Sequence, residues 1–139
     1  MIDKSVEMVY FMDMNIAGEQ KKFTILLVED DIDLSLIEKT ILMEEGYNVV
    51  TAATGADALG LLEVYKIDLV VLDLNLPDIN GEALLGKMKK IKPKIKVIIM
   101  TGQEDIDSYI HTLQLGAIDY LIKPVSPNGL TGVLKKILT

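Results

Sequence analysis

The sequence has no cysteine among its 139 residues, so neither a disulfide framework nor a thiolate site belongs to this protein. That absence suits a reducing cytosol, and we expect a cytoplasmic protein. All 14 basic side chains are lysines, so the fork with which arginine binds phosphate in a bidentate manner is missing. Any contact to phosphate must come from lysine, backbone N–H groups, hydroxyl groups or a metal ion.

Positive charge is also scarce, because the 14 lysines stand against 21 acidic residues and give a net charge of −7. This balance argues against nonspecific binding of the domain to nucleic acid or to an anionic membrane. The apolar run Met8–Met12 is too short to cross a bilayer, and acids flank it where a signal peptide would be basic. We expect residues 1–22 to form an extension of uncertain order, either a linker-like terminus or a short helix laid on the domain or a partner.

From Phe23 onward, strand and helix signals alternate five times. This strict alternation predicts an α/β fold with one parallel sheet, right-handed crossovers and helices on both faces, in a single domain over residues 23–139. The expected strands are Thr24–Val28, Tyr47–Thr51, Ile67–Asp73, Lys96–Thr101 and Ile118–Ile122.

Between the strands, apolar residues recur at helical spacing. Thr54 with Asp57 resembles a capping box, and Ser126 with Pro127 pairs an N-cap with a proline at N1. The apolar positions that mark the helices are Leu34, Ile37 and Ile41; Leu59 and Leu62; Leu84, Leu85 and Met88; Ile106, Ile110 and Leu113; and Leu130, Leu134 and Ile137.

Asp73 is the most informative residue because it ends the apolar run Leu69–Leu72. A buried parallel strand that ends in a carboxylate delivers an acid to the edge of the sheet where ligands bind in open α/β folds. The first strand likewise ends in Glu29, Asp30 and Asp31. Carboxylates that converge repel one another and call for a cation, and oxygen-only ligands favour a hard ion such as Mg²⁺. The sequence therefore predicts an acidic, metal-assisted phosphate site around Asp73.

Two further polar side chains are expected on the same edge of the sheet. Thr101 ends the fourth strand and Lys123 follows the fifth. A nucleophilic carboxylate, a metal cage, a hydroxyl donor and a cation are the parts that phosphoryl transfer to an aspartate requires. Taken singly, Asp73 and Thr101 would be ordinary strand-end residues and Asp31 would be a helix cap.

Four segments, in this order and at these spacings, resemble the receiver domain of two-component response regulators of the chemotaxis-Y type. The resemblance covers residues 23–138 and implies a flavodoxin-like, doubly wound five-stranded parallel sheet in the order 2-1-3-4-5. The segments are Val28–Asp31, Val71–Gly81, Ile99–Gly102 and Gly116–Pro124.

The resemblance implies that Asp73 accepts a phosphoryl group, with Mg²⁺, from the phosphohistidine of a histidine kinase or phosphotransfer protein. Glu29 and Asp30 match the acidic pair that holds the ion together with Asp73 and the backbone carbonyl of Asn75. The domain would catalyse its own phosphorylation and slow dephosphorylation but turn over no separate substrate. Downstream, it would act on a protein target or through an output domain that this chain lacks.

The resemblance also implies a switch. Lys123 matches the ammonium that pairs with the phosphoryl group, and Thr101 matches the hydroxyl that bonds it. Tyr120 matches an aromatic that turns inward when Thr101 is drawn to the phosphoryl group, and we expect both at the ends of adjacent strands. Pro124 matches a proline that follows a cis peptide bond. Partners are expected on the surface formed by the fourth helix, the fifth strand and the fifth helix.

Two positions depart from the commonest pattern of that family. Glu29 stands where aspartate is usual, and its extra methylene favours contact through a metal-bound water. Gly102 follows Thr101 where alanine is usual, which would loosen the loop that shifts on activation.

Two other classes of function fit parts of the sequence. An aspartyl-phosphate hydrolase uses the same nucleophile but needs a general acid two residues later, where Asn75 cannot protonate a leaving group. A phosphorylation-independent interaction module would have lost the residues needed for phosphoryl transfer. The complete set of acids, hydroxyl and lysine argues against this class. The lysines of residues 87–96 are expected to be a solvated helix end, with a docking patch for an acidic partner as the alternative.

Overall fold

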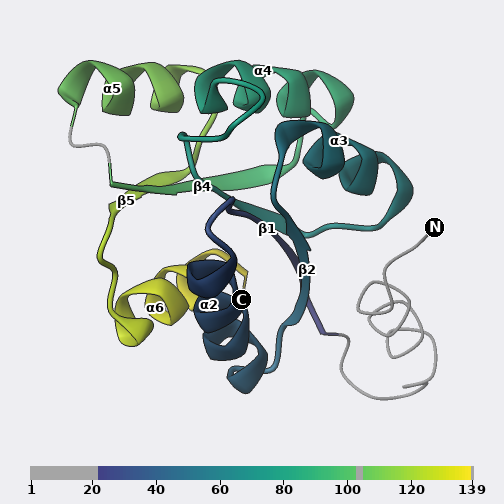
Figure 1. Cartoon of the computed structure of the whole chain (residues 1–139), viewed down its shortest axis with the longest axis vertical. Coiled ribbons are helices and arrows are strands. Elements are labelled where there is room, and N and C mark those ends of the chain that lie inside the picture. The colour runs from purple at the N-terminus through teal and green to yellow at the C-terminus, as the bar shows by residue number, and fades with distance from the viewer. Residues whose placement is uncertain (1–21, 103–104, 139) are drawn as a thin grey trace.

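Five strands pair in one parallel sheet in the computed structural model, which describes residues 22–102 and 105–138 (Figure 1). Their order is β2-β1-β3-β4-β5, which confirms the predicted order. The predicted extension over residues 1–22 lies, apart from Lys22, outside the described part of the chain. The strands are β1 Thr24–Val28, β2 Asn48–Ala52, β3 Leu69–Leu72, β4 Lys96–Thr101 and β5 Asp119–Ile122.

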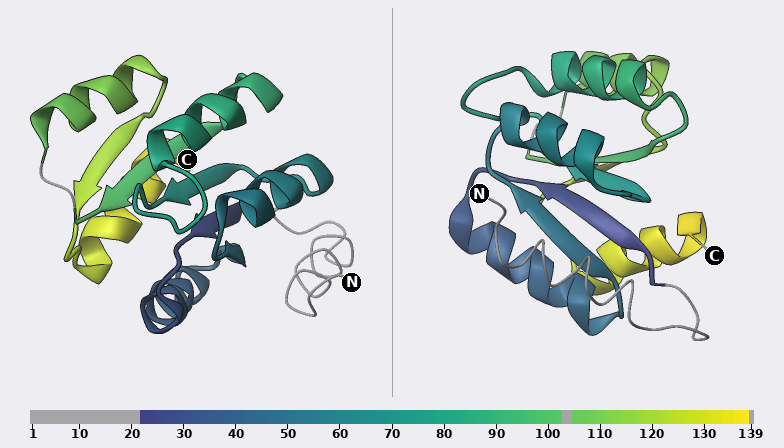
Figure 2. Two further views of the ribbon diagram at one scale, coloured as in Figure 1. Left: turned by 45° about the horizontal axis from the view of Figure 1, so that its top comes forward. Right: turned by 90° about the vertical axis from the view of Figure 1, so that its right-hand side faces the viewer.

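Helices cover both faces of this sheet (Figures 1 and 2). On one face lie α3 (Gly55–Val64), α4 (Gly81–Ile91) and α5 (Ile106–Gln114). On the other face lie α2 (Ile32–Glu44) and α6 (Pro127–Leu138). Within the two described ranges, no helix has the length and apolar character needed to cross a membrane.

The two faces of the sheet build two separate cores, because successive side chains of a strand point to opposite sides. In β1, Leu26 and Val28 pack in the core with α3 and α4, whereas Ile25 and Leu27 pack in the core with α2 and α6. Every residue of β1 and β3 is buried. These two central strands therefore give a rigid base to whatever stands at their carboxyl ends.

Side-chain caps fix where several helices begin. Thr54 Oγ1 accepts a hydrogen bond from Asp57 N at 3.1 Å, so this half of the predicted capping box is confirmed. Asp31 Oδ1 accepts from Leu34 N at 3.0 Å, which confirms its alternative role as a helix cap. Asn80 caps α4 in the same manner.

The apolar repeats predicted α2 and α5 but not the side that each helix buries. In α2 the buried residues are Glu38 and Leu42, while Ile37 is 57% exposed. In α5 the buried residues are Ser108 and Thr112, and the apolar positions that marked this helix are exposed. A helix on a sheet buries only one stripe, and here polar residues occupy part of that stripe.

Gly81 fixes the loop between β3 and α4, which carries Asn75. A Cβ atom at Gly81 would lie 2.4 Å from Leu74 Cα, and Gly81 N also donates to Leu74 O at 3.0 Å, so neither backbone segment has room to retreat. We expect Gly81→Ala to lower the free energy of unfolding by about 2 kcal/mol, as measured by urea denaturation.

Gly86→Ala in the same helix is the matched control, because a Cβ there would meet no atom within 4 Å. This variant should gain about 0.5–1 kcal/mol from the better helix propensity of alanine. Equal losses in the two variants would contradict the steric explanation.

Candidate functional site

The acids at the carboxyl ends of β1 and β3 are neighbours because the two strands pair directly. Val28 pairs with Leu72 in the parallel register, so the next residues, Glu29 and Asp73, stand side by side. Their backbones stay in the sheet ladder, with Glu29 N donating to Ala52 O and Asp73 N donating to Val28 O, both at 3.0 Å. Strand pairing therefore sets the spacing of the two carboxylates.

Three of the predicted acids form one cluster. Carboxylate oxygens of Glu29, Asp30 and Asp73 all lie within 4.8 Å of one another. Glu29 and Asp73 are buried, at 3% and 8% exposure, whereas Asp30 is exposed to solvent. Asp31 lies outside this cluster and serves as the cap of α2.

Lys123 reaches into this cluster from the loop after β5. Its ammonium donates to Asp73 Oδ2 at 2.8 Å and also bonds Glu29 Oε1. Lys123 N donates to Thr101 O at 2.8 Å, which ties the loop to the end of β4. The Lys123–Pro124 peptide bond is cis, as predicted. The structure thus brings the predicted lysine and two of the predicted acids into direct contact.

Two further donors bond the other oxygen of Asp73. Thr101 Oγ1 donates to Asp73 Oδ1 at 3.1 Å, and Asn75 N donates to the same oxygen at 3.0 Å. Thr101 is fully buried, at 0% exposure, so its hydroxyl has few alternative partners. The carboxylate of Asp73 is therefore held by an ammonium, a hydroxyl and a backbone N–H.

These contacts shift the pKa values of the two buried acids, Glu29 and Asp73, in opposite directions. Burial raises the pKa of Glu29 to about 7, assisted by the nearby charge of Asp73 and only partly opposed by Lys123. Burial would also raise the pKa of Asp73, but the hydrogen bonds from Asn75 and Lys123 outweigh it and hold that pKa below its usual value. Burial alone would lower the pKa of Lys123, yet its bonds to the two acids raise it. Negative charge is therefore concentrated on Asp73, faced by a permanently charged ammonium.

Tyr120 does not lie where the sequence placed it. In the register of β4 and β5, Thr101 pairs with Ile122, and Tyr120 pairs with Ile99 two residues earlier. The expectation that Thr101 and Tyr120 both stand at strand ends is wrong, because β5 continues for two residues past Tyr120 before the chain turns toward Lys123. The ring of Tyr120 is partly buried against α5, edge-to-face with Tyr109 at a centroid distance of 5.5 Å.

Two residues near the site were missed by the sequence. Asp78 receives hydrogen bonds from Gly55 N at 2.8 Å and Ala56 N at 3.0 Å, which lower its pKa and cap α3 from the loop after β3. Glu38 is 6% exposed on the inner side of α2, and its Oε1 has no hydrogen-bond partner among the described residues. The apolar repeat carried no signal for Glu38, because packing against the sheet decides which side of α2 is buried.

The donor set of the acidic cluster suits a hard divalent cation. All its candidate ligands are oxygens, and the three carboxylates are close enough for one ion to contact them after small side-chain movements. No sulfur or imidazole stands in the cluster, which is the pattern that distinguishes magnesium-type sites from zinc-type sites.

Comparisons with known proteins agree with this geometry. The model of the response regulator receiver domain family matches residues 25–135. The uncharacterized transcriptional regulatory protein YbdJ of Bacillus subtilis is 37% identical over 118 residues, covering 85% of this chain and 52% of that protein. The transcriptional regulatory protein ZraR of Salmonella typhimurium is 37% identical over 117 residues, covering 84% of this chain and 26% of that protein. The chain thus spans about half, or only about a quarter, of these curated relatives.

Solved structures give the same result for the fold. A CheY-like response regulator receiver domain protein from Methanospirillum hungatei superposes with a TM-score of 0.82 at 36% identity, covering 85% of this chain and 94% of that one. A two-component response regulator from Clostridium difficile superposes with a TM-score of 0.81 at 30% identity, covering 84% and 96%. In both cases the similarity extends over nearly the whole of the neighbour.

Proposed function

The chain belongs to the family of response regulator receiver domains, which are phospho-accepting signalling switches, and from that premise we propose that Asp73 is the residue it phosphorylates. The contacts of the Asp73 carboxylate carry this proposal, because Lys123, Thr101 and Asn75 N surround it with three donors. The test is to incubate the protein with a small phosphodonor and Mg²⁺ and to measure the mass added at Asp73.

In the proposed reaction, a carboxylate oxygen of Asp73 attacks the phosphorus atom of a phosphohistidine. The new P–O bond forms as the P–N bond breaks, and the imidazole of the donor leaves with the bonding electron pair. Lys123 remains beside the site and offers its ammonium to the transferred phosphoryl oxygens, and the Thr101 hydroxyl and Asn75 N–H supply neutral donors. The side chain of Asn75 cannot act as a general acid, which fits a stable phosphoryl-aspartate better than a hydrolase.

We also assign Mg²⁺ to the acidic cluster, with Glu29, Asp30, Asp73 and the backbone carbonyl of Asn75 as its ligands. When bound, the ion supplies positive charge for the phosphoryl oxygens. The chain's own residues then orient the acceptor, because Asp73 keeps its position through the sheet ladder and through Lys123.

Millimolar Mg²⁺ should raise the melting temperature of the protein. An ion present at ten times its Kd and bound only to the folded state adds about 1.4 kcal/mol, or about 3–6 °C for a domain of this size. Differential scanning fluorimetry over a Mg²⁺ titration measures this shift.

Asp30→Ala should abolish the shift, because Asp30 is the exposed member of the cluster and its loss removes a ligand without leaving a buried gap. Asp33→Ala is the control, since Asp33 is an exposed acid in the first turn of α2 and lies outside the cluster. A shift that survives Asp30→Ala unchanged would contradict the assignment of the ligands.

We propose that phosphorylation is read out through Thr101 and Tyr120. A phosphoryl group on Asp73 offers new acceptor oxygens to the Thr101 hydroxyl, which in the described state bonds Asp73 itself. Movement of that hydroxyl shifts the end of β4 relative to β5, on which Tyr120 packs against Tyr109 of α5. The proposed coupling thus leads from Asp73 in the acidic cluster to α5.

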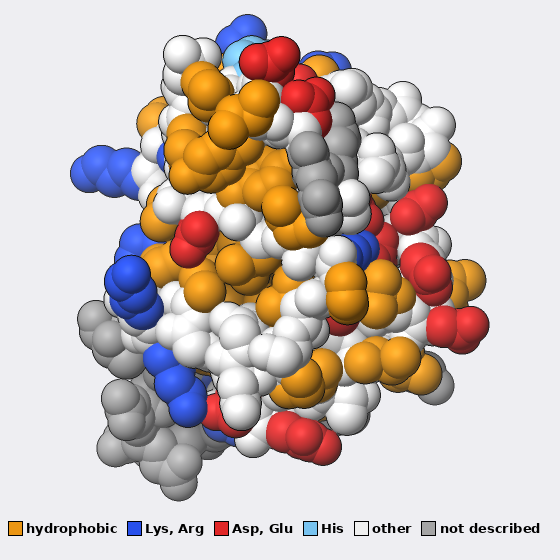
Figure 3. Space-filling view, turned by 90° about the vertical axis from the view of Figure 1, so that its left-hand side faces the viewer, with side chains coloured by type: hydrophobic (Ala, Val, Ile, Leu, Met, Phe, Trp, Pro, Cys, Tyr) orange, Lys and Arg blue, Asp and Glu red, His pale blue; other side chains and the backbone are white. Residues whose placement is uncertain are grey.

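The face formed by α5, β5 and α6 is the proposed output surface. Figure 3 shows hydrophobic side chains gathered on this face, and the most exposed of them lie on α5 and around β5. We propose that the phosphodonor is a histidine kinase or phosphotransfer protein. The output would be a protein target or an output domain beyond the matched region, as the greater length of the relatives named as transcriptional regulators suggests. The exposed apolar side chains are Ile106, Tyr109, Ile110, Leu113, Ile118 and Ile122.

A further inference from the structure

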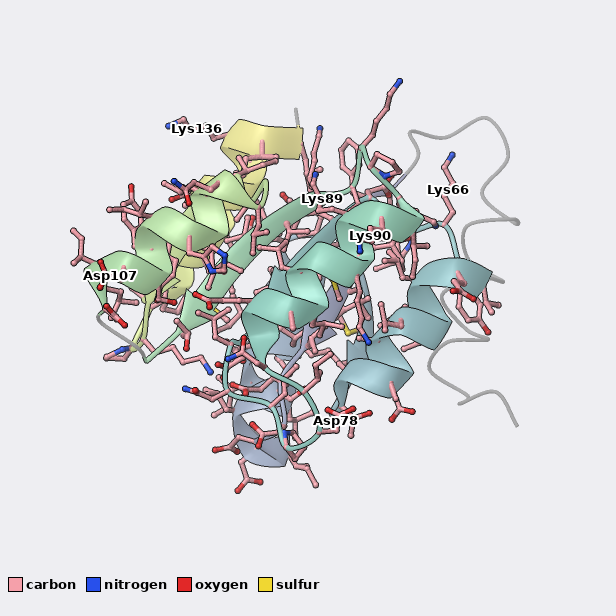
Figure 4. The ribbon with its side chains drawn as sticks, turned by 90° about the horizontal axis from the view of Figure 1, so that it is seen from above. Lys66, Asp78, Lys89, Lys90, Asp107 and Lys136 are labelled. Carbon is pink, nitrogen blue, oxygen red and sulfur yellow. The ribbon has the colours of Figure 1, made fainter. Side chains whose placement is uncertain are left out.

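A hollow of about 320 Å³ lies at the end of the sheet opposite the acidic cluster of Glu29, Asp30 and Asp73. Its walls come from the residues just before β1, β3 and β4 and from the end of α6. Lys92, Lys94 and Lys96 line it together with one acid, Asp68, whose carboxylate accepts a hydrogen bond from Thr24 N at 2.8 Å. The other walls are apolar side chains that include Phe23 and Leu138. Figure 4 shows the two ends of the molecule, with Asp78 near the rim and Lys89 toward the opposite end. With three lysines and one acid in its walls, the hollow therefore combines a net positive charge with apolar surface, away from Asp73 and the acidic cluster.

The lysines of this hollow belong to the most basic stretch of the chain. Residues 87–96 contain six of the 14 lysines and no acid, although the whole chain carries −7. Lys92 Nζ donates to Tyr65 O at 3.2 Å and Lys96 Nζ to Ile137 O at 3.4 Å, so backbone carbonyls hold these two ammonium groups in place. Neither these two lysines nor Lys94 forms an ion pair with the described residues. Their charge is left for a ligand with negative groups.

A segment with complementary charge and apolar character precedes the hollow in the chain. Residues 3–13 contain three acids and one lysine, for a net charge of −2, and enclose the five apolar residues Met8–Met12. The chain leading to this segment leaves from Phe23, which itself lines the hollow. The ten residue-to-residue steps from residue 13 to residue 23 can span up to about 33 Å, so the segment can fold back. A short tether of this kind gives an effective concentration of about a millimolar.

We propose that residues 3–13 bind in the lysine-lined hollow, with Met8–Met12 on its apolar walls and the flanking acids beside Lys94 and Lys96. The contact is intramolecular and covers the end of the sheet that takes no part in phosphoryl transfer. It leaves the rim around Asp73 and the face of α2 open.

The negative charge of residues 3–13 favours the hollow over the exposed apolar surface of α2. Ile32 and Leu36 are exposed on α2, at 80% and 63%. Acids surround them, however, with Asp31 and Asp33 at the start of the helix and Glu44 at its end. An acidic segment is repelled there and attracted to the lysines.

The absence of cysteine makes a direct test simple, because Ser5→Cys introduces a single thiol into the full-length chain. A nitroxide spin label on this thiol broadens the NMR signals of nearby amides. We expect the amide signals of Asp68, Lys94 and Lys96 to lose most of their intensity, and those of Leu36 and Thr40 on α2 to be unchanged. Broadening centred on α2, or spread evenly over the domain, would overturn the proposal.

Two charge-reversal variants separate a defined site from general attraction. Lys94→Glu/Lys96→Glu should abolish the broadening, whereas Lys87→Glu/Lys90→Glu should leave it, because these lysines lie in the same basic stretch but outside the walls of the hollow. Equal loss in both variants would overturn the proposal in favour of diffuse attraction. Mixing spin-labelled protein with isotope-labelled protein that lacks the spin label should give no broadening; if it does, the occupant is a second copy and the intramolecular contact is wrong.

Discussion

Asp73→Asn should reduce the uptake of acid-labile phosphate to background, a loss of about a hundredfold or more. A neutral amide oxygen cannot replace the carboxylate as nucleophile, although Asn can still accept the hydrogen bonds of Thr101 and Asn75 N. Incubation with a small phosphodonor and Mg²⁺, followed by intact-mass measurement before and after acid treatment, gives the result. The unsubstituted protein should gain one phosphate group, and the variant none.

The matched control is Asp33→Asn, which makes the same chemical change at an exposed acid of α2. This variant should be phosphorylated at the rate of the unsubstituted protein. If Asp73→Asn still took up acid-labile phosphate at that rate, another residue would be the acceptor and the assignment of Asp73 would be wrong.

Glu38→Gln should increase the stability of the protein at alkaline pH, mainly because the buried side chain can no longer ionise. Burial raises the pKa of Glu38 to about 7 from an ordinary value of 4.5, and the charges of Glu29 and Asp73 add to this, while Lys123 opposes it. Between these two pH values the unfolded chain has released the proton and the folded chain retains it. Stability is therefore lost as the pH rises from 4.5 to about 7.

The variant removes this loss, because glutamine does not titrate. Its gain in unfolding free energy over the unsubstituted protein should grow by about 2.5 kcal/mol between pH 5 and pH 8. Urea denaturation at both pH values measures the difference. Glu44→Gln changes an exposed glutamate in the same helix and should show no such growth. A pH-independent difference for Glu38→Gln would mean that the buried carboxyl titrates in its ordinary range.

The strands and the acidic site could be predicted from the sequence because each depends on a short local pattern. The apolar runs ending in Asp73 and in Glu29 define buried parallel strands, and parallel pairing brings their ends together whatever the helices do. The partners of Lys123 could not be derived in the same way. Its contacts to two acids at once depend on the path of the loop after β5, for which the resemblance to receiver domains was needed.

What the sequence did not predict depends on rotation and register. A repeat of apolar residues shows that α2 and α5 are helices, but the direction in which each faces is decided by packing against the sheet. The repeat therefore does not mark Glu38, although its side chain is buried, and it includes Ile37, although that side chain is exposed. The position of Tyr120 differs from the expectation by two residues for a related reason. The pairing of β4 with β5 places Tyr120 opposite Ile99, and not opposite Thr101 at the strand end.

The backbone hydrogen bonds of Glu29 and Asp73 make the site persist for as long as the domain stays folded. Glu29 N is bonded to Ala52 O of the edge strand β2 and Asp73 N to Val28 O of β1, so fraying of a loop does not separate the two acids. Separating β1 from β3, the interior strands that end at these two acids, requires opening of the whole domain, which costs about 5–15 kcal/mol in proteins of this kind. No long-lived state should therefore exist in which the sheet survives and the acceptor is disassembled. The capacity to take up phosphate is accordingly a reporter of how many molecules in a sample are native.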